Sequence, residues 1–103
     1  MTQPEKIEHI LNGGCEYFGI TREELTKKTG SHSSIWNKKL YLVMVLYDYT
    51  VCNMTDIATY LGYSSHNTVS YHLKIKKEEL SEKMYGSDKT KRVYSELLKY
   101  LEL

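Results

Sequence analysis

An almost wholly apolar run from Leu40 to Tyr47 lies near the middle of the sequence. Val and Tyr favour strands, so a buried strand is one interpretation of this run. The helical interpretation covers more of the chain, because apolar residues already recur at helical spacing from Ile35 onward. That length favours a central helix buried on most sides, with Ser33 or Ser34 as its N-cap.

A first helix is predicted to begin near Pro4, which suits the first turn of a helix. The apolar residues that follow at near-helical spacing are Ile7, Ile10, Leu11 and Phe18. Gly13 and Gly14 each weaken a helix by about 1 kcal/mol relative to Ala, so this helix can bend there. A capping box formed by Thr21 and Glu24 predicts a second, short helix, which ends in the polar stretch KKTGSHSS.

Three further helices are predicted after the central one. Asn53 as N-cap and Gly62 as the stop bound a short helix. The next helix runs from about Ser65 to Tyr85 and ends at Gly86, and Ser87 caps the last helix. The apolar residues assigned to these last two helices are Val69, Leu73, Ile75, Leu80, Val93, Leu97, Leu98 and Leu101. The sequence therefore predicts an all-α domain of five or six helices, with no convincing strand.

The chain length of 103 residues is that of a single domain, residues 1–103. An apolar share of 41% and a charged share of 26% are ordinary for a soluble globular protein. No apolar run approaches the roughly 20 residues that a membrane span needs. The start, MTQPEKIEHI, has no signal-peptide pattern, so a cytoplasmic location is expected.

Cysteine and histidine spacing predicts no metal site. Cys15 and Cys52 are far apart and are expected to be free, mostly buried thiols in a reducing compartment. His66 and His72 are six residues apart, so they do not share one helix face as i, i+4 ligands would. The net charge of +1 allows nucleic-acid binding without indicating it, because DNA-binding domains are usually more basic.

The two helices joined by GYSS form the clearest functional unit. A helix-turn-helix needs a small residue where the helices cross and a Gly in the turn, and Ala58 and Gly62 supply them. Ile57 and Leu61 of the first helix are expected to face Val69 and Leu73 of the second. Spacing alone leaves open a simple pair of packed helices in a bundle.

The second helix of this pair opens with polar residues. Ser64 or Ser65 would be its N-cap, and His66, Asn67 and Thr68 follow. Recognition helices place their N-terminal residues against base edges in the major groove. Asn bonds adenine in a bidentate way, and Thr offers a methyl to thymine. The alternatives are that Ser65 is only a cap and that His66 is only a solvated surface residue.

This stretch resembles the C-terminal DNA-binding domain, domain IV, of the bacterial replication initiator DnaA. The hallmark of that family is a Gly, a short turn, and Asp-His-Thr-Thr-Val leading into a helix. The residues of GYSSHNTVSYHLKI that match it are Gly62, His66, Thr68, Val69, Lys74 and Ile75. YFGITREEL, HSSIWNKKLYLVMVL and MTDIATYLG resemble other elements of the family, so the resemblance covers about residues 7–80. It implies a Trp-repressor-like helix-turn-helix fold.

The resemblance also implies where DNA is contacted. Base contacts fall on Ser65, His66, Asn67 and Thr68. A basic loop that reaches the minor groove would hold Lys27, Lys28 and His32. Contacts to the DNA backbone fall on Ser33, Ser34, Lys38 and Lys39. Independently of the resemblance, Lys74, Lys76 and Lys77 are expected to hold phosphates as well. Ser65 stands where the family has Asp, and Asn67 where it has the first Thr, which predicts a different target sequence.

The leading functional hypothesis is sequence-specific binding of double-stranded DNA without catalysis, in replication or transcription control. No Gly-rich phosphate loop is present, so the chain is expected to be either an isolated domain or a stand-alone protein, such as one from a phage or mobile element. No cofactor, metal, membrane or small-molecule substrate is implied. The last helix, residues 87–103, is expected to cover the core or to pair with a second copy in a homodimer.

Two other hypotheses remain open at the level of sequence. In one, the chain is an interaction module that binds a replication protein and has lost DNA binding. Ten tyrosines suit such an interface. In the other, the chain is an enzyme, but its carboxylates are scattered and no Ser or Cys has an obvious base beside it. The sequence therefore predicts that the protein is not an enzyme.

Overall fold

The computed structural model describes residues 2–27, 34–81 and 87–103, and these residues form an all-helical fold without strands. The helices are α1 (Gln3–Phe18), α2 (Arg22–Thr26), α3 (Ser34–Tyr49), α4 (Met54–Leu61), α5 (His66–Ser81) and α6 (Ser87–Tyr100). The prediction of an all-α domain with five or six helices is confirmed. The end of α5 near Tyr85 and its stop at Gly86 lie outside the described residues.

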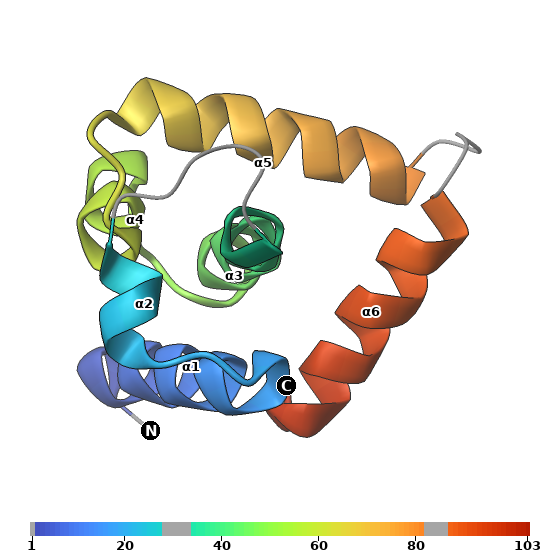
Figure 1. Cartoon of the computed structure of the whole chain (residues 1–103), viewed down its shortest axis with the longest axis horizontal. Coiled ribbons are helices and arrows are strands. Elements are labelled where there is room, and N and C mark those ends of the chain that lie inside the picture. Colours follow the sequence, from blue (N-terminus) through green and yellow to red (C-terminus); the bar gives the residue numbers. More distant parts are fainter. Residues whose placement is uncertain (1, 28–33, 82–86) are drawn as a thin grey trace.

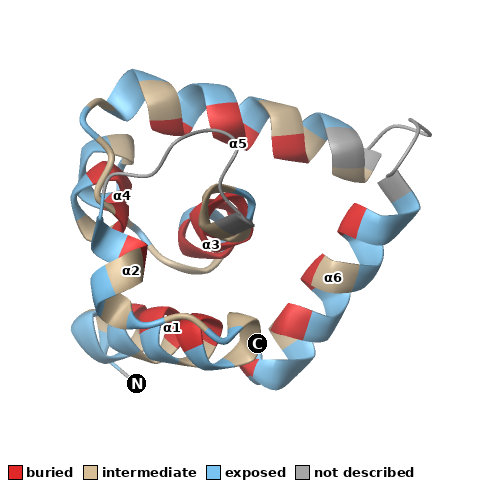
Figure 2. Ribbon diagram, viewed as in Figure 1, coloured by how far each residue is buried: buried red, intermediate tan, exposed pale blue. Residues whose placement is uncertain are grey.

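Helix α3 occupies the centre, and the other five helices form a frame around it (Figure 1). Every residue from Leu40 to Leu46 is at most 3% exposed. Buried residues of the surrounding helices face α3 (Figure 2). The apolar run is therefore helical and is covered on all sides from Leu40 to Leu46, and the strand interpretation of this run is wrong.

The glycines of α1 mark close helix contacts. Helix α1 runs unbroken from Gln3 to Phe18 through both glycines. A Cβ on Gly13 would lie 2.4 Å from Leu101 Cδ2, and one on Gly14 would lie 2.4 Å from Leu42 Cδ2. The two positions let the end of the chain and α3 approach the α1 backbone, so their low helix propensity accompanies tight packing.

The predicted helix boundaries are confirmed where side chains cap them. Thr21 and Glu24 exchange two hydrogen bonds of 3.1 and 3.0 Å, which form the capping box of α2. Asn53 caps α4 in the same way. Gly62 ends α4 in the left-handed conformation. These local bonds fix helix starts independently of the core.

Cys15 is buried and Cys52 is partly buried, and both are free thiols, as predicted. Burial raises the pKa of Cys15, which makes its thiolate less accessible. None of the helices that the structure describes combines the length and apolar character needed to cross a membrane.

Candidate nucleic-acid interface

The turn between α4 and α5 is held by its own backbone and by α2. Gly62 has φ of +72°, and its N–H donates to the Ala58 carbonyl. The N–H of Tyr63 donates to the same carbonyl at 2.9 Å. A Cβ on Gly62 would lie only 1.9 Å from the Thr26 carbonyl oxygen at the end of α2. Both the backbone angle and this contact therefore require glycine.

Apolar residues fix α5 against α4, as the sequence predicts. Ile57, Leu61 and Val69 are completely buried, and Leu73 is 8% exposed. The two helices pack directly against one another (Figure 1). The first half of α5 is therefore held by its inner side, and its opposite side is presented outward.

Ser65 caps α5. The helix begins at His66, and the Ser65 hydroxyl oxygen accepts a hydrogen bond from the N–H of Asn67 at 3.1 Å. This bond satisfies one of the donors that a helix N-terminus leaves unpaired. Of the two predicted N-cap candidates, Ser64 and Ser65, it is therefore Ser65 that caps the helix.

We call the outward side of the first half of α5 the α5 outer face. Its exposed residues are His66, Asn67, Ser70, Tyr71 and Lys74. Thr68 is half-buried at its edge, whereas Val69, His72 and Leu73 face the core. From His66 to Lys74 the helix rises by about 12 Å, which matches three to four base pairs of DNA.

Lys39 is not on this surface. Its side chain is 1% exposed, and its ammonium donates to the Lys27 carbonyl at 2.6 Å and to the Leu61 carbonyl at 2.9 Å. Burial lowers the pKa of Lys39. The prediction that Lys39 contacts the DNA backbone is therefore wrong, because its ammonium is buried and bonded to two backbone carbonyls.

Lys76 and Lys77, further along α5, contact residues of α3. Lys77 pairs with Asp48 and lies 5.8 Å from the Tyr47 ring centroid. Lys76 is 4% exposed, and its ammonium lies 4.5 Å from the Tyr41 ring centroid. Lys76 is therefore not a surface cation, and a phosphate at Lys77 would have to compete with Asp48.

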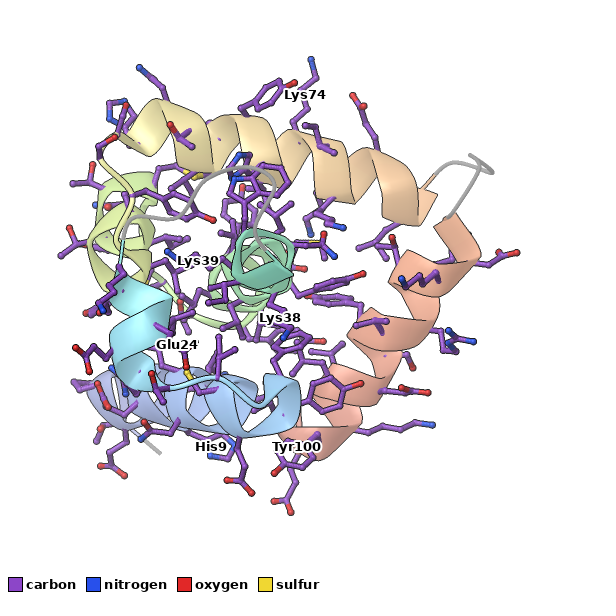
Figure 3. The ribbon with its side chains drawn as sticks, in the orientation of Figure 1. His9, Glu24, Lys38, Lys39, Lys74 and Tyr100 are labelled. Carbon is purple, nitrogen blue, oxygen red and sulfur yellow. The ribbon has the colours of Figure 1, made fainter. Side chains whose placement is uncertain are left out.

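Lys38 and Lys74 project in different directions. The Trp36 ring packs edge-on against His72 of α5, with centroids 4.7 Å apart. Lys38 follows two residues later, which is about 200° further around α3. In Figure 3 Lys74 extends from the outer side of α5, whereas Lys38 lies on the side of α3 away from α5. The structure therefore does not bring Lys38 to the α5 outer face.

Part of the predicted basic loop falls outside the described residues, namely Lys28, His32 and Ser33. Ser34 is the first residue of α3, and its side chain is not described. Lys27 is exposed just after α2, and its ammonium lies 3.9 Å from the Glu23 carboxylate. Of the lysines predicted to contact DNA, Lys74 alone among the described ones lies on the α5 outer face.

Two features of this region were not predicted from the sequence. Tyr71 is 63% exposed on the α5 outer face, and its position four residues after Asn67 could have indicated this. His72 is buried between the rings of Trp36 and Tyr63. Burial lowers the pKa of His72 and raises that of Tyr63. His72 Nδ1 and the Tyr63 hydroxyl are buried without a hydrogen-bond partner.

Within residues 2–27, 34–81 and 87–103, no three His, Cys, Asp or Glu side chains are grouped to hold a metal ion. Comparison of the chain with protein-family models, with curated proteins and with solved structures gives no match. The chemistry of the α5 outer face is therefore the basis on which a function is assigned.

Proposed function

We propose that this protein binds double-stranded DNA in a sequence-specific manner. In this proposal α4 and α5 are a helix-turn-helix of the Trp-repressor-like kind, and the α5 outer face enters the major groove. The observation that carries the proposal is the division of α5 into a buried side, which includes Val69 and Leu73, and an exposed polar side at its N-terminus. Recognition helices use this division to reach base edges.

The residues of the α5 outer face supply the donors and acceptors that base edges require. The Asn67 side chain is exposed and makes no hydrogen bond to a described residue, so its amide is available to bond adenine N6 and N7. His66 and Ser70 add polar groups on either side. The amides at the start of α5 and the helix dipole favour a phosphate at the same end.

The distribution of cations predicts weak salt dependence. Affinity falls with salt by a slope of about 0.9 per phosphate neutralised. With Lys74 as the one described lysine on the α5 outer face, that face would neutralise few phosphates. Binding by this face would therefore depend on base contacts more than on charge. The resemblance to the initiator domain supports a role in replication or transcription control.

Selection of bound duplexes from a random pool tests this proposal. One enriched sequence is expected, and Asn67→Ala should lose about 1–3 kcal/mol of discrimination at one base pair. Ser70→Ala changes a serine of the α5 outer face. Its control is Ser95→Ala, which changes an exposed serine on α6 and should bind like the parent protein. A pool in which no sequence is enriched at low salt would refute the proposal.

A second candidate is an interaction module that binds a replication protein. It is favoured by the lysines that the fold withdraws from solvent, Lys39 and Lys76, and by the exposed Tyr71. Exposed tyrosines are common where proteins meet. Lack of any enriched DNA sequence, together with loss of partner binding in Tyr71→Ala, would favour this candidate over DNA binding.

A further inference from the structure

Two helix C-termini converge on the ammonium of Lys39. The carbonyl of Lys27 lies at the end of α2, and the carbonyl of Leu61 lies at the end of α4. Both accept a hydrogen bond from Lys39 Nζ, at 2.6 and 2.9 Å. The last carbonyls of a helix lack partners within the helix and carry partial negative charge. One buried cation therefore satisfies two helix ends whose sequence positions are far apart.

The same ammonium is connected to α5 through Tyr63. Lys39 Nζ lies 5.4 Å from the centroid of the Tyr63 ring, and the Tyr63 ring packs edge-on against His72 with centroids 5.5 Å apart. Tyr63 belongs to the turn, and His72 belongs to the inner side of α5. Packing thus runs without interruption from the end of α2 to the recognition helix of the proposed helix-turn-helix.

The other end of α2 is fixed as well. Arg22 donates to the Glu8 carboxylate at 2.9 Å and to the Asn12 side-chain oxygen at 2.7 Å. These bonds join the start of α2 to α1. Helix α2 is thus joined to α1 at its start, and the bonds from Lys39 Nζ join its C-terminal end to the end of α4.

We infer that Lys39 is a positioning residue, which sets the orientation of α5 relative to Lys27 without contacting DNA. This inference rests on the proposed function. Lys27 is an exposed lysine expected to reach the minor groove, and α5 carries the residues expected to read the major groove. A duplex is rigid on this length scale, so the two contacts are made together only when their separation is fixed. Lys39 fixes it from inside the protein.

A purely stabilising role predicts a different result. A destabilised protein has a smaller folded fraction, which weakens binding to every duplex by the same factor. A positioning residue changes the ratio of affinities for a selected and a scrambled duplex. The ratio of affinities therefore separates the two roles.

The experiment compares Lys39→Met with Lys74→Met by fluorescence anisotropy on the selected duplex and on a scrambled duplex, at several salt concentrations. Lys39→Met keeps an apolar side chain of similar length but removes the cation. Its ratio of affinities should fall by roughly 2- to 30-fold. Lys74→Met should lower the slope by about one and keep the ratio.

Two outcomes would overturn the inference. The first is a folded Lys39→Met protein with the parent ratio. If Lys39→Met does not fold, Tyr63→Leu is measured instead, since it removes the ring between Lys39 and His72. An unchanged ratio in Tyr63→Leu is the second. If selection enriches no sequence at all, the proposed function itself has failed, which is distinct from these outcomes.

Discussion

Replacement of Gly62 by alanine should lower the free energy of unfolding far more than the same change at Gly19. The two residues are matched, because each ends a helix in the left-handed conformation, with φ of +72° and +70°. They differ in their surroundings. A Cβ at Gly62 would lie 1.9 Å from the Thr26 carbonyl oxygen, whereas a Cβ at Gly19 would have nothing within 4 Å.

The magnitude follows from two contributions. A non-glycine residue in the left-handed region costs about 1–2 kcal/mol, and this cost applies to both positions. At Gly62 the new methyl also meets backbone, which cannot turn aside as a side chain can, and overpacking of this kind costs about 1–3 kcal/mol. Gly62→Ala should therefore lose about 2–5 kcal/mol and Gly19→Ala about 1–2 kcal/mol.

Urea denaturation followed by far-ultraviolet circular dichroism and by the fluorescence of Trp36, the one tryptophan of the chain, measures both variants. The midpoint should shift while the denaturant slope stays constant. Any effect of alanine on the unfolded chain is shared by the two variants and cancels in their difference. Equal losses at Gly62 and Gly19 would show that the turn is not pressed against the end of α2.

Three other predictions concern the core around α5. Tyr63→Phe should raise the free energy of unfolding by about 1 kcal/mol in urea denaturation, because it removes a buried hydroxyl that has no partner; a clear loss would contradict this. Burial lowers the pKa of His72 below its usual 6.5, so the unfolded chain binds more protons and stability should fall as the pH drops from about 7 to about 5. His72→Phe should reduce that fall, and an unaltered pH profile would argue against a buried neutral imidazole. Asp48→Ala should lose about 1–3 kcal/mol in thermal or urea unfolding, because Asp48 accepts from Tyr94 at 2.9 Å and pairs with Lys77; an unchanged midpoint would refute a structural role for this link.

Features set by neighbouring residues could be predicted from the sequence. The capping boxes at Thr21 and Asn53 and the stop at Gly62 depend on bonds within a few residues. The central helix could be predicted because its apolar run continues from residues already at helical spacing. The cap at Ser65 and the outward direction of His66 and Asn67 likewise depend only on residues close by in the sequence.

The burial of Lys39 could not be predicted from neighbouring residues. Lys39 is buried because the ends of α2 and α4 meet, 12 and 22 residues away along the chain. No local pattern reports such a meeting. Lys76 is different, since it lies seven residues after Val69 and three after Leu73, on the side of α5 that faces the core. Helical spacing therefore predicts that Lys76 faces the core, whereas its charge alone suggests an exposed position.

The enclosure of α3 between Leu40 and Leu46 gives a hydrogen-exchange experiment two separate signals in this protein. Amides of Leu40 to Leu46 lie within the buried stretch, so they should exchange only when the whole molecule unfolds. Amides in the first turn of α5 lack partners within the helix and should exchange through local opening. A ligand on the α5 outer face would slow the second set directly. One exchange experiment can thus measure global stability and occupancy of that face from different parts of the same chain.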